Sequence, residues 1–152
     1  MKVKDYLEEK GVGFQTHEHE AAYTAQEFAA REHVSGKMVA KSVVVCGNGN
    51  FALCVLSANR NLDMEKVARV MKATMVRLAD EVEMAKLFPD AEVGAEPPFG
   101  NLYALPTFVD TQLAHDKEIV FEAGTHHQAA RMKYEDYSRL VKPTVCDLAT
   151  ML

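Results

Sequence analysis

The sequence predicts an α+β fold in which a mixed, curled β-sheet is surrounded by helices. Predicted strands outnumber predicted helices, and the two interleave irregularly instead of alternating as they do in a doubly wound sheet. The two longest predicted strands are apolar on both faces, which is typical of strands that are covered on both sides. A chain of 152 residues has the size of one ordinary domain. We therefore expect a single domain over residues 1–152.

A hairpin of residues 39–46 and 51–56 is the clearest element, and both of its arms are apolar. Asn48 and Gly49 between the arms form a preferred pair for a two-residue hairpin turn. With this turn, Cys46 and Cys54 project from opposite faces of the ribbon, because side chains alternate along a strand. We therefore expect no disulfide between them.

The remaining elements follow from periodicity, capping and turn signals. We expect helices at residues 2–10, 25–32, 62–71, 80–88 and 134–141, and strands at residues 12–16, 75–78, 107–109, 118–121 and 129–133. Thr24 and Glu27 have the spacing of a capping box at the start of the second helix. Prolines and glycines exclude regular structure from residues 93–103.

Charge and composition restrict the partners and the compartment. A formal net charge of −5 leaves no broad basic surface, so attraction to a nucleic acid would be weak or confined to a patch, and we expect no DNA partner. No apolar run approaches the roughly 20 residues of a membrane span, and the first residues lack the apolar core of a signal peptide. Three cysteines without a Cys-x-x-Cys pair fit a reducing compartment. These features predict a cytoplasmic protein that has no membrane partner.

Lys41 is unusual because it opens a strand that is otherwise apolar on both faces, on the same face as Val43 and Val45. Its side chain could simply extend to solvent at the end of the strand. Alternatively, it could direct a cation at an anionic substrate group or at a polarised carbonyl. The sequence alone leaves both interpretations open.

The loop of residues 94–100 (GAEPPFG) has two prolines and two glycines around Phe99. Such a rigid loop can present backbone N–H groups to an oxyanion or an ester oxygen. It can equally be a structural turn that covers the core with Phe99. Neither interpretation is excluded by the sequence.

A turn at residues 123–127 presents Thr125, His126 and His127 between two predicted strands. These side chains could bind a substrate, or they could be solvated. His17 and His19 share one face of a strand, but no third ligand follows at metal spacing, so we expect no metal site. The chain also lacks a Gly-x-Ser-x-Gly motif, a phosphate-binding glycine-rich loop and a zinc-deaminase signature.

Several segments in this order carry a family resemblance: residues 39–45 (VAKSVVV), 94–100 (GAEPPFG), 108–110 (FVD), 119–126 (IVFEAGTH) and 131–132 (RM). With them the chain resembles the YbaK/prolyl-tRNA synthetase-associated editing domain family over about residues 1–145. The resemblance implies a barrel-like mixed sheet with helices packed around it. It also implies a free-standing deacylase that hydrolyses the ester of a mischarged aminoacyl-tRNA without a metal or another cofactor. The fine pattern is similar to the branch that includes Ala-tRNA(Pro) deacylases, so a small amino acid is the one that this resemblance expects to be removed.

The same resemblance implies roles for individual residues. Lys41 would hold the terminal phosphate or ribose of the tRNA, and the loop from Gly94 to Pro98 would bind the substrate carbonyl or its α-amino group. These three are the expected catalytic residues. The expected substrate-binding residues are Ser42, Phe99, Gly100, Gly124, Thr125 and His126. The free ribose hydroxyl beside the ester would help to orient or activate water.

Contact with tRNA is expected from basic residues that follow the hairpin. Lys66, Arg69 and Lys72 recur every three residues on a predicted helix, and Arg60 and Arg77 bracket it. The alternative is a solvated charged face. The expected partner is the acceptor end of tRNA, and a synthetase is a further candidate.

Three other functions compete with this prediction. The chain could be a non-catalytic module that binds aminoacyl-tRNA or a synthetase. It could hydrolyse a small free amino-acid ester or amide, or it could be a metal-dependent hydrolase. The sequence does not identify the amino acid that is removed.

Overall fold

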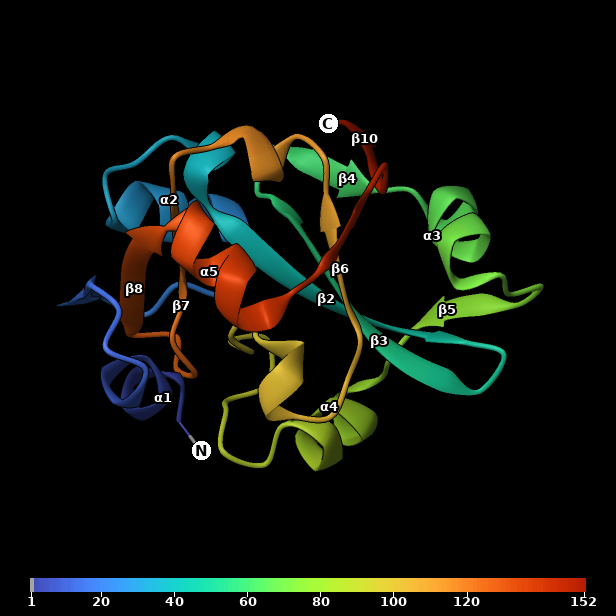
Figure 1. Ribbon diagram of the computed structural model, residues 1–152, viewed down its shortest axis with the longest axis horizontal. Helices are drawn as coiled ribbons and strands as arrows, with labels where there is room; N and C mark the ends of the chain where they lie inside the picture. Colours follow the sequence, from blue (N-terminus) through green and yellow to red (C-terminus); the bar gives the residue numbers. More distant parts are fainter. Residues whose placement is uncertain (1) are drawn as a thin grey trace.

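The central hairpin lies in the middle of a five-stranded sheet in the computed structural model, which describes residues 2–152 (Figure 1). The strand order is β5-β2-β3-β6-β9, and β3–β6 and β6–β9 are the parallel pairs. The strands are β2 (Ala40–Gly47), β3 (Asn50–Ser57), β5 (Val76–Leu78), β6 (Thr107–Asp110) and β9 (Thr144–Cys146). The sheet is therefore mixed, as predicted.

The turn of the hairpin has the predicted geometry. Asn48 and Gly49 have φ values of 50° and 85°, and two positive φ values are what the preferred hairpin turn requires. The Asn48 side-chain oxygen accepts hydrogen bonds from the backbone N–H groups of Thr74 and Met75, which ties the turn to the start of β5. All three cysteines are free, which confirms that Cys46 and Cys54 form no disulfide.

A second, antiparallel sheet stands beside the first. Its order is β1-β8-β7, from β1 (Phe14–Glu18), β8 (Gln128–Lys133) and β7 (Glu118–Glu122). A single bridge between Val39 and Val120 joins the beginning of the hairpin to β7. A third, two-stranded sheet pairs β10 (Ala149–Met151) with β4 (Arg60–Leu62). The α+β class is confirmed, whereas the strands of residues 2–152 do not close into a barrel.

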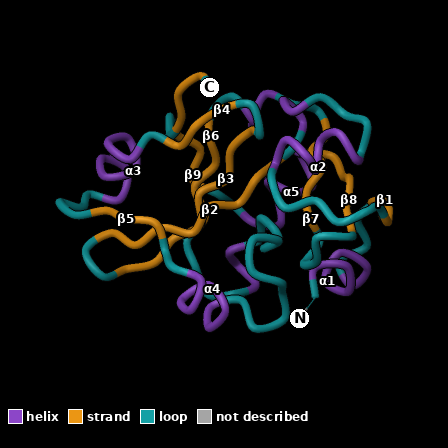
Figure 2. The backbone as a smooth tube through the Cα atoms, turned by 180° about the vertical axis from the view of Figure 1, so that it is seen from behind, coloured by secondary structure: helices purple, strands orange, loops and turns teal. Residues whose placement is uncertain are grey.

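Helices cover these sheets, and Figure 2 shows them from behind. They are α1 (Val3–Glu9), α2 (Ala25–Arg31), α3 (Met64–Met71), α4 (Glu81–Leu87) and α5 (Tyr134–Val141). In both views α3 and β5 lie at the opposite end of the hairpin from α2. None of the helices in residues 2–152 has the length and apolar character of a membrane span.

Side-chain caps set the beginnings of three helices. The Thr24 hydroxyl accepts from the Glu27 N–H at 3.0 Å, and Asp80 and Glu83 form a complete capping box. The helix expected from residue 62 begins two residues later, because Leu62 pairs with Ala149 in the small sheet and Asp63 caps α3.

The largest core cluster is built around Phe99, which is fully buried. Its ring centroid lies 5.4 Å from that of Phe121 and 5.2 Å from that of Tyr137 on α5. A second cluster, which includes Phe28 and Val39, packs α2 against the bridge between the two large sheets. This second cluster forms the apolar side of the cavity described next.

Candidate active site

A cavity of about 180 Å³ lies where α2, the beginning of β2 and the loop before Pro97 meet. Its polar lining residues are Lys41, Ser42, Gly94, Glu96 and Glu122, and its apolar and aromatic lining residues are Tyr23, Ala25, Phe28, Val39 and Ala40. The structure thus brings the predicted residues Lys41, Ser42 and Gly94 together around one cavity.

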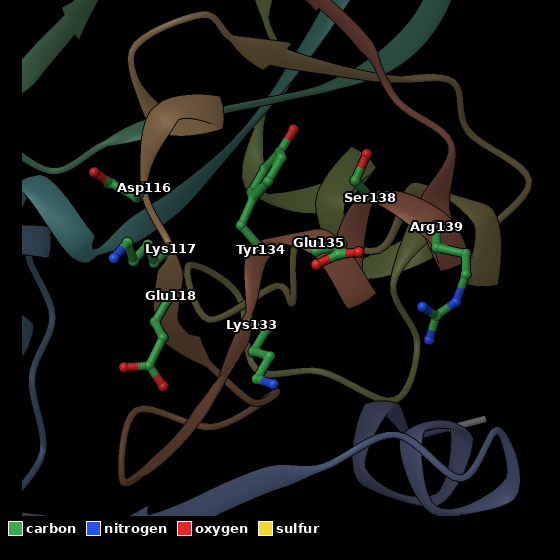
Figure 3. Close-up of a pocket in the computed structure, with 8 residues that line it drawn as sticks. All are labelled: Asp116, Lys117, Glu118, Lys133, Tyr134, Glu135, Ser138 and Arg139. Carbon is green, nitrogen blue, oxygen red and sulfur yellow. The ribbon is translucent and has the colours of Figure 1, made fainter.

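A larger hollow of about 800 Å³ lies elsewhere, beside β7, β8 and α5. Figure 3 shows that its rim carries charges of both signs, including Glu118, Lys133, Glu135 and Arg139. It contains none of the residues expected at the site. The smaller cavity is therefore the candidate active site.

Lys41 is half-buried, and its amine donates a hydrogen bond to the carbonyl oxygen of Arg60 at 2.6 Å. Burial lowers the pKa of this amine from its ordinary value. An ammonium group has three N–H donors, so one bond to Arg60 leaves further donors for a ligand. Lys41 thus lines the cavity as an anchored cation, whereas a lysine that simply extended to solvent would have no such anchor.

The loop from Gly94 is held by bonds within the protein. The Gly94 N–H donates to the carboxylate of Glu96 at 2.8 Å, and the Ala95 N–H donates to the carbonyl of Glu92 at 2.9 Å. The Phe99 N–H donates to the Pro97 carbonyl. These amides are occupied, so the expectation that they face an oxyanion is not met in this structure. The loop offers the cavity a carboxyl group instead.

The position of Gly94 requires a residue that has no side chain. Its φ is +91°, and an added Cβ would lie 3.2 Å from Cε1 of His126. His126 is buried, and its Nδ1 and Nε2 atoms each lie 2.9 Å from a carbonyl oxygen, of Ala22 and Val93 respectively. His126 therefore supports the Gly94 turn from behind.

The other residues of the 123–127 turn also brace this loop. The Gly124 N–H donates to the Ala95 carbonyl at 3.1 Å, and the Thr125 hydroxyl accepts from the His127 N–H. None of Gly124, Thr125 and His126 lines the cavity. Their expected role in substrate binding stays a prediction, and the contacts of Gly124 and His126 in this structure support the loop.

Phe99, Gly100 and Pro98 are likewise placed in the core and not at the cavity. A side chain at Gly100 would overlap Thr107 and the Leu105 carbonyl. The Pro98 carbonyl accepts a hydrogen bond from the Tyr137 hydroxyl at 2.6 Å. This placement matches the alternative interpretation, a structural turn that covers the core. Each of the three residues is packed in the core or forms a hydrogen bond there.

Two glutamates of the cavity were missed by the sequence analysis. Glu96 is 5% exposed, and the Glu122 side chain is 14% exposed. Burial, followed by the charges of Glu96 and Glu92, raises the pKa of Glu122 to about 8. Burial also raises the pKa of Glu96. The sequence does indicate both residues weakly, because each is an ionisable residue beside an apolar one. Glu122 follows Phe121, and Glu96 precedes Pro97.

The basic residues expected to contact tRNA fall into two groups. Arg60, Lys66 and Arg77 form ion pairs with Asp110, Asp147 and Glu83, respectively. Arg69 and Lys72 are exposed, and neither forms an ion pair with another of residues 2–152. Arg60 and Lys66 both donate to the Ala149 carbonyl, so a basic strip extends outward from Lys41.

His17 in β1 and His19 just after it lie near a carboxylate. His17 Nδ1 is 2.7 Å and His19 Nε2 is 3.8 Å from the same Glu32 oxygen. Across residues 2–152, no group of three or more His, Cys, Asp or Glu side chains could hold a metal ion.

Comparison with known proteins connects this geometry to a family. The sequence profile of the aminoacyl-tRNA editing domain matches residues 19–140. A curated relative, the "Multifunctional Ser/Thr-tRNA deacylase ProXp-y" of Escherichia coli (strain K12), is 28% identical over 142 residues, which cover 90% of this chain and 84% of the relative.

Solved structures agree with this result. A crystal structure of a proposed trans-editing enzyme for prolyl tRNA synthetase has a TM-score of 0.86 at 27% identity, covering 97% of this chain and 94% of that one. The hypothetical protein APE2540 has a TM-score of 0.88 at 21% identity, covering 99% and 100% of the two chains, and this likeness shows the fold alone.

The matching profile and the likeness to a proposed trans-editing enzyme define an enzyme of the hydrolytic editing class. More specifically, the chain belongs to the aminoacyl-tRNA editing domain family. Its reaction is the hydrolysis of the ester in a mischarged aminoacyl-tRNA, which confirms the predicted activity. The non-catalytic alternative gains no support from these findings.

Proposed function

We propose that this enzyme removes a small amino acid from tRNA in trans, with the ester held in the cavity between Lys41 and the Gly94 turn. The observation that carries the proposal is the presence of both elements around one cavity of about 180 Å³. This volume is well below the roughly 300–1,000 Å³ of pockets for drug-sized ligands. It suits a small aminoacyl group whose ribose remains at the mouth.

The proposed chemistry needs no protein nucleophile, because aminoacyl esters are already activated. Lys41 binds the terminal phosphate or ribose and keeps positive charge close to the carbonyl, where negative charge develops during attack by water. The free ribose hydroxyl beside the ester orients or activates that water. The remaining rate acceleration comes from holding the ester and the water in the geometry that the reaction requires.

The proposed side-chain specificity is exclusion of large residues, with serine, threonine and alanine as the candidates. A tight pocket rejects larger side chains by overlap, whereas one extra methylene in a favourable contact contributes only about 1–3 kcal/mol. The Ser42 hydroxyl lines the cavity, and its oxygen is buried without a hydrogen-bond partner among residues 2–152. A hydroxyl-bearing substrate would supply that partner. This agrees with the substrates in the name of the Escherichia coli relative.

The proposed partner is the acceptor end of tRNA, bound through the basic strip that begins at Lys41. Arg60 and Lys66 would be its inner residues, and Arg69 and Lys72 its outer ones. The similarity to a proposed trans-editing enzyme for prolyl tRNA synthetase makes that synthetase the candidate protein partner. A deacylase of charged tRNA acts where translation occurs, so we also propose a cytoplasmic location.

A deacylation panel of Ala-, Ser-, Thr- and Cys-charged tRNAs tests the proposal. We expect hydrolysis of the small substrates, and we expect Lys41→Ala to lower kcat/KM by about 100-fold or more, because it removes the cation at the reacting ester. Lys133→Ala, which changes an exposed lysine at the larger hollow and outside the candidate site, is the matched control and should retain activity. A folded Lys41→Ala variant with wild-type kcat/KM would contradict the proposed role.

The panel should include a short acylated nucleoside. An enzyme that reads tRNA should strongly prefer the intact charged tRNA to this small ester. Equal rates on both would instead support the remaining alternative, a hydrolase of small amino-acid esters.

A further inference from the structure

The cavity presents two buried carboxyl groups, and the backbone donors near them are already used. The Gly94 and Ala95 N–H groups bond inside the loop, and one of the three Lys41 N–H donors bonds to the Arg60 carbonyl. One oxygen of Glu122, Oε2, is buried and has no hydrogen-bond donor among residues 2–152. A buried acceptor without a donor is costly, so a ligand that brings donors would be favoured here.

Among residues 2–152, the basic group nearest to Glu122 is His126. Its Nδ1 atom lies 3.3 Å from Glu122 Oε2 and 2.9 Å from the Ala22 carbonyl oxygen, so its shorter contact is with that carbonyl. The Lys41 amine bonds to Arg60 and forms no ion pair with either cavity glutamate. The pKa of Glu122 is raised to about 8 because the carboxyl is buried and because the acidic groups Glu96 and Glu92 lie near it. A positively charged ligand group would allow this carboxyl to ionise.

The substrate of the proposed reaction carries such a group. In an aminoacyl ester the α-ammonium is attached to the carbon next to the ester carbonyl, and it has three N–H donors and a positive charge. Charge-assisted bonds from ammonium to carboxylate are about twice as strong as neutral hydrogen bonds. The cavity has a cation on β2 and two carboxyls on β7 and the loop, so it complements a ligand with an anionic phosphate at one end and an ammonium at the other.

We propose that Glu122, assisted by Glu96, binds the free α-ammonium of the aminoacyl group, so that the enzyme acts on aminoacyl-tRNA and rejects N-acylated or peptidyl-tRNA. This inference rests on the proposed function and names the part of the substrate that the site recognises. Glu96 contributes through its position at the cavity wall, where its carboxylate also holds the Gly94 turn. Glu122 is the specificity-determining residue.

Rejection of blocked substrates follows from the same geometry. An N-acyl group replaces the ammonium by a neutral amide with one N–H, and it adds bulk to a cavity of about 180 Å³. Glu122 would then remain buried without a charged partner. Sites built around a polar substrate group discriminate strongly against analogues that lack it.

The test compares the best aminoacyl-tRNA from the panel with its N-acetylated form. The wild type should hydrolyse the free form at least about 100-fold faster, as expected for a site that requires a polar group. Glu122→Gln should raise KM for the free form and reduce this ratio to within about tenfold, while its rate on the acetylated form stays the same or rises. Glu118→Gln, on the same strand but outside the cavity, should keep the wild-type ratio.

Each other outcome has a defined meaning. If the wild type hydrolyses both forms at similar rates, the inference is wrong and the proposed function stands. If Glu122→Gln lowers both rates equally, Glu122 is structural and the inference is also wrong. If the wild type hydrolyses no charged tRNA of the panel, the proposed function fails and this inference fails with it.

Discussion

At the scale of single residues, the site depends on ionisable groups that are held partly out of water. Lys41 has a lowered pKa and Glu122 a raised one, and in both cases burial is the first cause. The sequence could identify Lys41 because a lysine interrupts a strand that is apolar on both faces. It could not identify Glu122 as easily, because Glu122 comes at the end of its strand, where a charged residue is ordinary.

The raised pKa of Glu122 predicts a pH-dependent stability. The native carboxyl keeps its proton up to about pH 8, whereas an unfolded one loses it near 4.5, so the native state binds more protons in this window. The free energy of unfolding should therefore fall as pH rises from 4.5 to 8, by on the order of 5 kcal/mol from this group. Glu122→Gln should flatten that decline.

Urea unfolding at pH 5.5 and 8.5, for the wild type and Glu122→Gln, measures this effect. The other ionisable groups are the same in both proteins, so the difference between the two pH dependences reports mainly on Glu122. Parallel slopes would show that Glu122 is already ionised in the native protein.

At the scale of elements, the loop at residues 93–99 is held in shape by its neighbours. The 123–127 turn supports it through His126 and Gly124, and α5 holds it through the bond from Tyr137 to Pro98. The sequence indicated a rigid loop from its prolines and glycines. It assigned the residues of the turn to the substrate because a histidine that supports a loop and one that binds a ligand have the same local pattern.

Gly94→Ala tests the rigidity of this loop. The substitution meets both a positive φ and a close contact with His126, so it should destabilise the protein by about 1–3 kcal/mol and lower kcat/KM by displacing the cavity wall. Gly13→Ala, where no atom lies within 4 Å of the added Cβ, is the matched control. Thermal unfolding and single-turnover deacylation measure the two effects, and wild-type values for Gly94→Ala would refute this account.

The long elements and the three-residue strand β5 were predictable, whereas the short strands β4, β9 and β10 were not. The hairpin follows from its apolar arms and from the turn residues Asn48 and Gly49, and α5 follows from its own apolar pattern. All of these are local signals. By contrast, β4 exists because Leu62 pairs with Ala149, and β9 exists because it adds to β6. Such strands of three residues depend on partners that are distant in the sequence, so local patterns cannot locate them.

At the scale of the whole molecule, an acidic protein must bind an acidic substrate. The net charge is −5, and three of the five candidate basic residues are paired with carboxylates of the same chain. Binding therefore relies on few phosphate contacts. The sequence could place the basic residues on a helix, but it could not tell which of them were neutralised by acidic residues such as Asp110 and Asp147.

The exposed pair Arg69 and Lys72 should contribute most of the outer tRNA contact. Arg69→Glu combined with Lys72→Glu should raise KM several-fold at low salt, with a smaller effect at 200 mM salt, because each phosphate contact steepens the salt dependence by about one logarithmic unit. Salt titrations of kcat/KM measure this slope. Glu65→Lys on the same helix serves as a charge control, and an unchanged KM in the double variant at low salt would exclude this surface as a tRNA contact.

The single bridge between Val39 and Val120 has a consequence for how activity arises during folding. The lysine wall and the glutamate wall of the cavity belong to different sheets and come from distant parts of the chain. Contacts between distant segments form late, because the intervening loop must close first. A chain that has completed only its hairpin therefore lacks the glutamate wall of the pocket, and we expect deacylation to begin only after the second sheet has docked.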